Sequence, residues 1–148
     1  MKISCLPVSL FSDLIQGTMR LDEWSNNAFR IGLDGIDISI AMIKNHNPSY
    51  LADLGRRITS LPIIMATSYP DFTHPDPLQR QRELDYCRAD IALCSQLGVR
   101  YLRVLAGQAH PAVSRSEGIA RAVEIAEQTG EVFHPGALRF YRELGWIE

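Results

Sequence analysis

The stretch LPIIMATSYPDFTHPDP, residues 61–77, decides the fold class. It begins with a nearly unbroken apolar run, 61–66, and continues into a loop with three prolines, two aspartates and one histidine. A short apolar run bounded by such turn residues is typical of a strand buried on both faces, as in parallel sheets. Similar runs occupy 2–8, 35–41 and 99–106. We therefore expect four buried strands.

A helical pattern follows each apolar run. Asn47-Pro48 and Asp76-Pro77 place proline at the first helical position, and Ser114 stands at capping-box spacing from Glu117. The expected helices run from about 21 to 31, 48 to 61, 77 to 98 and 114 to 130. Strands that alternate with helices predict the α/β class, with parallel strands in the order 1-2-3-4 and helices on one face of the sheet.

Composition excludes several classes of protein. The chain has 148 residues, which suits one domain, and its 15 basic and 17 acidic residues give a net charge of -2. No basic run is long enough to follow a nucleic-acid backbone, and no apolar run approaches the ~18 residues of a membrane span. The N-terminus is interrupted by Pro7, Ser9 and Ser12 before a signal-peptide core is complete, so we expect a cytoplasmic protein. Cys87 and Cys94 are expected to be buried thiols.

Charged residues on two strands favour a barrel over an open sheet. Strand alternation places Asp37 opposite the isoleucines of its strand, and Arg103 opposite Leu102 and Val104. An open sheet covered by helices on both faces has little use for such charges, whereas a barrel interior near its open end tolerates them. The glycines are isolated and form neither a GxGxxG fingerprint nor a P-loop, which disfavours nucleotide binding.

Polar residues follow the ends of the expected strands. His46, His74 and His110 come after the second, third and fourth strands, where binding and catalysis occur in parallel α/β folds. The candidate substrate-binding residues are Asp37, Asp71, His74, Arg103, Gln108 and His110. An alternative is that the histidines are solvated loop residues and that Asp37 and Arg103 form a structural ion pair.

Two segments carry a resemblance to a known family. GLDGIDIS at 32–39 and SYPDFTHPDPLQRQRELDYCRADIALCSQLGVRYLRVLAG at 68–107 resemble the sugar phosphate isomerase/epimerase family, which has a xylose isomerase-like TIM barrel. The resemblance covers roughly 1–129. It implies isomerisation or epimerisation of a sugar or sugar phosphate with a divalent metal ion (Mn, Mg, Zn or Co). The loop at 67–77 would then belong to the mouth of the barrel.

The sequence departs from that family in its length. A TIM barrel takes ~250 residues and eight strands, and four strands are expected here. We therefore expect a half barrel over 1–130 and an atypical tail over 131–148, without the family's metal ligands. The chain is then an isomerase or epimerase that is incomplete and inactive alone, or a non-catalytic truncated half barrel or binding remnant. A DNA endonuclease of the related barrel type is disfavoured by the charge balance.

A half barrel also leaves strand edges and one sheet face without a partner. A homodimer would cover the face that carries Tyr101 and Leu105, and is the favoured solution. Alternatively, the tail, which is rich in aromatic residues, folds back as a helix over that face. Neither a nucleic acid nor a membrane is an expected partner.

Overall fold

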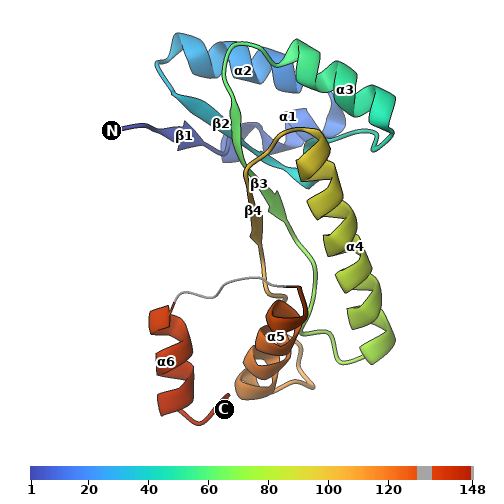
Figure 1. The fold of residues 1–148 in the computed structure, drawn as a ribbon, viewed down its shortest axis with the longest axis vertical. Coiled ribbons are helices and arrows are strands. Elements are labelled where there is room, and N and C mark those ends of the chain that lie inside the picture. The colour runs from blue at the N-terminus through green and yellow to red at the C-terminus, as the bar shows by residue number, and fades with distance from the viewer. Residues whose placement is uncertain (130–134, 148) are drawn as a thin grey trace. The chain divides into compact units, whose positions relative to one another are not determined.

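The chain folds into two compact units. The structure is a computed structural model that describes residues 1–129 and 135–147. The first unit comprises Met1–Ser68 and Arg88–Val104, and the second comprises Tyr69–Cys87 and Leu105–Glu148. The sheet belongs entirely to the first unit, whereas the loops that follow its last two strands belong to the second (Figure 1).

The four strands are parallel and lie in the order β1-β2-β3-β4, as predicted. Three strands are shorter than the apolar runs that predicted them, whereas β3 has the six residues of its run but begins two positions later. The strands are β1 (Ser4–Cys5), β2 (Gly35–Ser39), β3 (Ile63–Ser68) and β4 (Tyr101–Val104). The second run stops early because Ile40–Met42 form a 3-10 turn, η2, in which the Ser39 hydroxyl accepts a hydrogen bond from Ala41 N at 3.1 Å. The fold is therefore α/β, as predicted.

Three of the helices, α3, α4 and α5, begin where the caps predict. The longer helices are α2 (Leu21–Arg30), α3 (Pro48–Arg57), α4 (Pro77–Gln96), α5 (Arg115–Thr129) and α6 (Pro135–Glu143). Two short helices, η1 (Val8–Leu10) and α1 (Phe11–Gln16), were not predicted. The expected continuation of α3 to residue 61 is wrong, because the helix ends at Arg57. The predicted end of α5 near Gly130 lies outside the described residues.

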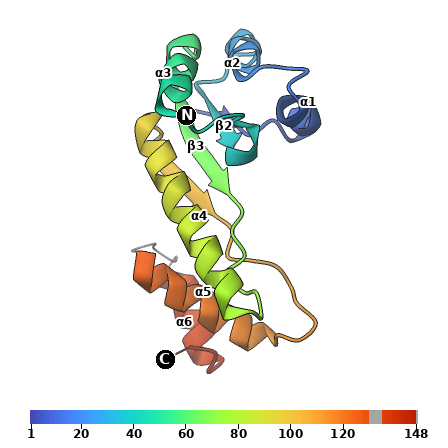
Figure 2. The same cartoon turned by 90° about the vertical axis from the view of Figure 1, so that its right-hand side faces the viewer.

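Apolar side chains join the helices of the first unit to one face of the sheet. The core cluster contains Leu14, Leu21, Trp24, Ala28, Ile36, Ile38, Leu51, Leu54, Ala66, Leu93 and Cys94. These side chains come from α1, α2, α3 and the last part of α4, together with β2 and β3. Figure 2 shows these helices and strands as a ribbon. The helices of the first unit thus share one face, as predicted. An ion pair of 3.5 Å between Arg57 and Asp22 also joins α3 to α2.

The opposite face of the sheet is polar. Asp37 and Ser39 on β2 and Thr67 on β3 are buried there, whereas Tyr101 and Arg103 on β4 are exposed. In the sheet register Asp37 pairs with Met65, which in turn pairs with Tyr101. Arg103 pairs with Thr67. Within the described part of the chain, Asp37 and Arg103 form no ion pair. The structural ion pair considered from the sequence is therefore not formed.

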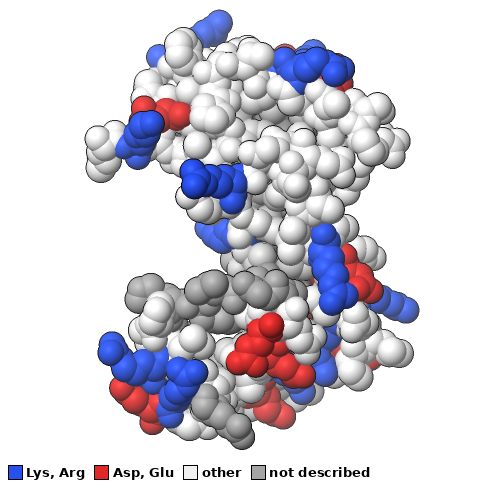
Figure 3. Space-filling view, viewed as in Figure 1, with Lys and Arg blue, Asp and Glu red and all other residues white. Residues whose placement is uncertain are grey.

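The remaining sequence predictions concern cysteines, charge and membranes. Cys87 and Cys94 are buried thiols outside any disulfide, as predicted, and Cys5 is an exposed thiol. Acidic and basic side chains are interspersed over the surface that Figure 3 shows. No helix in the described ranges is long and apolar enough to cross a membrane.

Candidate functional site

Two loops of the second unit carry most of the candidate residues. One follows β3 and leads into α4, and the other follows β4 and leads into α5. Each loop is fixed at its helical end by a cap. Asp76 Oδ1 accepts a hydrogen bond from Leu78 N at 2.9 Å, and the Ser114 N–H donates to Glu117 Oε2 at 2.9 Å. Phe72, only 1% exposed, anchors the first loop between Ser68 and Pro77.

Asp71 is the centre of the contacts between the two loops. Its Oδ2 lies 2.8 Å from Nε2 of His110, and its Oδ1 accepts hydrogen bonds from the Thr73 hydroxyl at 2.9 Å and from Gln108 N at 3.1 Å. Burial alone would raise the pKa of Asp71. The hydrogen bonds from Thr73, Gln108 N and His110 outweigh burial, so the pKa lies below its usual range. Asp71 is therefore a well-stabilised carboxylate.

Thr73 and Gly107 bring the loops into close contact. The Thr73 hydroxyl lies 2.6 Å from the carbonyl oxygen of Gln108 and 3.1 Å from its N. Gly107 has a φ of 143°, and a Cβ at this position would lie 2.7 Å from Asp71 Oδ1. Only glycine adopts this backbone conformation without strain and leaves room for the carboxylate. We name Asp71, Thr73, His74, Gln108 and His110 the loop cluster.

The two histidines of the loop cluster meet edge to face. Their ring centroids are 5.1 Å apart and the rings are inclined by 75°. Nδ1 of His74 accepts a hydrogen bond from Asp76 N at 3.1 Å, so the proton of its neutral ring is on Nε2. Nε2 of His110 donates to the Asp71 carboxylate, so Nδ1 of its neutral ring is a proton acceptor. The two rings therefore offer one donor and one acceptor.

Residues on the following helices support the first loop. Arg80 Nη1 donates to the carbonyl oxygen of His74 at 2.7 Å, and Arg121 Nη1 donates to that of Thr73 at 3.2 Å. Glu83 Oε2 accepts a hydrogen bond from Asp71 N at 3.2 Å. Sequence analysis missed these residues because their partners are loop backbone groups, which leave no pattern in the sequence.

A pocket of about 430 Å³ lies beside the loop cluster. Its lining residues include Thr73, Gln108 and His110, together with Ser114 and Tyr141. Alanine, glycine, valine and isoleucine side chains line much of the remainder. A largely apolar pocket of this size with a few polar groups is typical of a small-molecule site.

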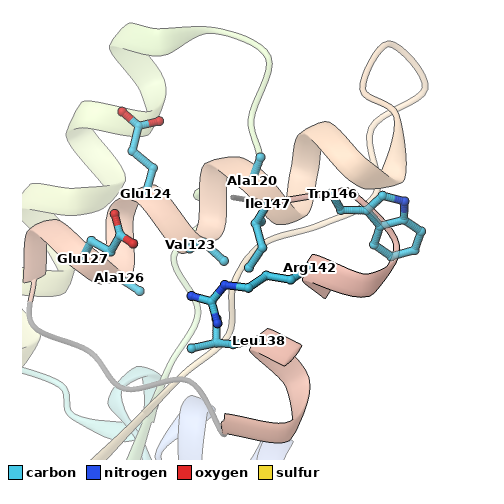
Figure 4. Close-up of a pocket in the computed structure, with 10 residues that line it drawn as sticks. Ala120, Val123, Glu124, Ala126, Glu127, Leu138, Arg142, Trp146 and Ile147 are labelled. Carbon is cyan, nitrogen blue, oxygen red and sulfur yellow. The ribbon is translucent and has the colours of Figure 1, made fainter. Parts of the chain in front are cut away.

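A second pocket of the same unit has a different chemistry. It has a volume of about 490 Å³ and lies between α5 and α6, where Figure 4 shows Glu124 and Glu127 at one end and Trp146 at the other. None of the residues predicted for the site lines this pocket. Neither a histidine nor a hydroxyl is among its lining residues. The pocket beside the loop cluster is therefore the better candidate.

The structure brings four of the six predicted residues together. Asp71, His74, Gln108 and His110 belong to the loop cluster. Asp37 and Arg103 belong to the first unit, on strands separated by β3. His46, also in the first unit, is an exposed loop residue. Thr73 and Gly107 were missed as members of the site. The TH pair within DFTHPDP and the glycine that ends the β4 segment are the signals that could have found them.

The residues of this site do not fit a divalent metal ion. Both Asp71 oxygens already accept hydrogen bonds, and only His110 joins it as a potential ligand at short distance. Across residues 1–129 and 135–147, no group of three or more His, Cys, Asp or Glu side chains is placed to hold a metal. A stable site of this kind needs more ligands than one such pair supplies.

Comparison with known proteins identifies the fold. The family described as xylose isomerase-like TIM barrel matches residues 26–144. No curated protein is significantly similar in sequence.

Several solved structures are similar in fold. A D-psicose 3-epimerase determined with D-fructose has a TM-score of 0.69 at 13% identity, over 86% of this chain and 47% of that one. A probable 3-DHS dehydratase, AsbF, from Bacillus anthracis has a TM-score of 0.59 at 17% identity, over 88% and 49%. The 3-keto-D-glucoside 4-epimerase YcjR from E. coli has a TM-score of 0.58 at 17% identity, over 89% of this chain and 54% of that one. The chain spans about half the length of these structures.

Proposed function

Because the chain belongs to the xylose isomerase-like TIM barrel family, we propose that it is the N-terminal half of a sugar isomerase or epimerase. Its substrate would be a sugar or sugar phosphate, bound in the pocket beside the loop cluster. Two of the solved structures with this fold are named as epimerases of sugars, which supports the substrate class. Catalysis is a property that we assign to the complete barrel. The cytoplasmic location stays a prediction.

The observation that carries this proposal is the pair of Asp71 and His110. The carboxylate holds the imidazole through Nε2 at 2.8 Å, which leaves Nδ1 available to a ligand. An imidazole oriented in this way accepts a proton from a hydroxyl group, or orients that hydroxyl by a hydrogen bond. The amide side chain of Gln108 and the ring of His74 add donors that suit a polyol. The loop cluster therefore has the chemistry of sugar recognition.

Sugar binding is the first test. We expect D-fructose to bind weakly, with a Kd on the order of millimolar, because the loop cluster offers it only a few hydrogen-bonding groups. Titration followed by NMR should shift the imidazole signals of His110 and His74. His110→Gln should abolish saturable binding, whereas His46→Gln, at an exposed loop position, should leave it unchanged. Saturable binding that survives His110→Gln would contradict the proposed site.

Metal content and turnover distinguish the incomplete enzyme from a binding remnant. The family implies a divalent metal, but the described residues of this chain do not fit one, so no step of this proposal uses it. We expect less than stoichiometric Mn²⁺ to remain after dialysis and no measurable ketose epimerisation by the chain alone. Turnover on addition of Mn²⁺ would show that the chain is itself an enzyme. Sugar binding with no turnover on adding a complementary half barrel would favour the remnant.

A further inference from the structure

The sheet of the first unit has two open edges. β1 pairs only with β2, and β4 pairs only with β3, within the part of the chain that the structure describes. Unpaired backbone groups on such edges favour pairing with a further strand. The chain also spans about half of the solved structures that it resembles, 47% to 54% of their length. A closed eight-stranded barrel would need four further strands beside these.

The face of the sheet that would line a barrel is also unsatisfied. Asp37 Oδ1 and Thr67 Oγ1 are buried and have no hydrogen-bond partner among the described residues. On the edge strand β4, Tyr101 is 55% exposed, and Arg103 on the same face is exposed as well. Buried polar groups without partners are uncommon in folded proteins. This face therefore has the buried polar groups of a barrel interior, and within the described residues no strand forms the opposite wall of such a barrel.

We propose that a second copy of this chain supplies the opposite wall. β4 of each copy would pair in parallel with β1 of the other, which gives a closed ring of eight strands with twofold symmetry. One type of contact, made twice, then uses all four open edges, so no third copy can add. The inference rests on the sheet of the first unit and not on the proposed sugar chemistry.

The charges on the inner face suit a ring of two copies. In eight-stranded parallel barrels, alternate strands contribute their side chains to the same interior layers. Asp37 lies on β2 and Arg103 on β4, so both belong to the same alternate set. In the proposed ring each Arg103 lies two strands from the Asp37 of its own copy and two strands from that of the other. Acidic and basic side chains would therefore alternate around the interior.

Sedimentation of the purified chain tests the assembly. We expect a species of twice 16.6 kDa at tens of micromolar chain. Tyr101→Glu places a charge on the inner face and should give a folded monomer, with far-UV circular dichroism as the check on folding. Phe29→Glu is the matched control, because Phe29 is 61% exposed on α2 of the same unit and should not affect the dimer.

Chemical cross-linking tests which strands meet. Cys5 on β1 is the exposed thiol, whereas Cys87 and Cys94 are buried and burial raises the pKa of Cys94 to about 11. Cys5 pairs with Ile36, so it shares the sheet face of Leu102 and Val104. Leu102→Cys or Val104→Cys should therefore give covalent dimers with a short thiol cross-linker. The wild type and Tyr101→Cys, which points to the other face, should cross-link several-fold less.

Three results would overturn the proposal. A wild-type chain that stays monomeric at about 100 micromolar would exclude a stable barrel of two copies. A dimer that persists in folded Tyr101→Glu would place the interface on another surface. Equal cross-linking of Tyr101→Cys, Leu102→Cys and Val104→Cys would show that β4 and β1 of different copies are not paired.

Discussion

Different interactions stabilise the interior of each of the two units of this chain. In the first, aliphatic side chains from four helices cover one face of a parallel sheet, and the buried positions are far apart in the sequence. In the second, the two loops are joined by hydrogen bonds that converge on Asp71 and Thr73. An apolar core loses stability with the buried volume that a substitution removes, whereas a hydrogen-bond network loses it when a single partner is removed. The two units should therefore respond differently to substitution.

The largest effect is expected in the core of the first unit. Leu51, on α3, is 1% exposed, so Leu51→Ala leaves a cavity and should lower the free energy of unfolding by about 2–5 kcal/mol. Ile31→Ala, at a position 70% exposed, should change it by less than about 0.5 kcal/mol. Urea denaturation followed by circular dichroism measures both. Equal costs for the two variants would contradict the packing described for this unit.

Gly107→Ala should be the most costly change in the loops. The added Cβ meets Asp71 Oδ1 at 2.7 Å, and the φ of 143° strains any other residue, so we expect a loss of about 1–3 kcal/mol. Gly118→Ala is the control. Gly118 lies inside α5, where alanine is a better helix former than glycine. Its added Cβ would make an ordinary 3.6 Å contact with Thr73. If Gly107→Ala were neutral in chemical denaturation, the close approach of the loops would be wrong.

Removal of the Asp71 charge should have a smaller effect. Asp71→Asn keeps the size of the side chain but weakens its hydrogen bonds with His110 and Thr73, so we expect a loss of about 1–2 kcal/mol. Asp76→Asn is the matched change in the same loop, and it should cost only a few tenths of a kcal/mol because asparagine caps helices as well as aspartate. The pair compares the network directly with a local cap. A larger cost for Asp76→Asn would reverse our ranking.

The smallest effect, a dependence on pH, should have opposite signs in the two units. The pKa of Asp71 is lowered, so its contribution to stability is present above the ordinary carboxyl value of 3.8 and is lost as the pH falls through the folded pKa. In the first unit, burial raises the pKa of Asp90 despite a hydrogen bond from Ser68. Its contribution is present below 3.8 and is lost as the pH rises through the folded pKa.

Thermal unfolding from pH 3 to 8, roughly the range where carboxylates titrate, measures this difference. Asp90→Asn should raise the melting temperature near neutral pH, whereas Asp71→Asn should lower it. Melting temperatures that move in the same direction for both variants would remove this distinction between the units.

The sequence predicts the regular structure of the first unit better than the contacts of the second. Proline after Asn47 marks the start of α3 through local backbone preference, and apolar runs mark strands through burial. The short helix α1 was missed because Ser12 and Asp13, near its start, are also typical of loops.

The candidate site depends on contacts that local patterns do not encode. Asp71 and His110 were expected at the same edge of the sheet, but their hydrogen bond joins residues 39 positions apart. The role of Thr73 follows from its distance to Gln108, which is set by the path of two loops. The conformation of Gly107 is equally invisible in the sequence, because an isolated glycine occurs in many backbone environments.

The close approach at Gly107 also constrains how this sequence can change during evolution. A side chain at position 107 needs space that Asp71 and Thr73 now occupy. A larger residue there becomes acceptable only after one of those two positions has become smaller, and the first change alone weakens the connection between the loops. Positions 71, 73 and 107 should therefore covary or stay fixed among natural variants.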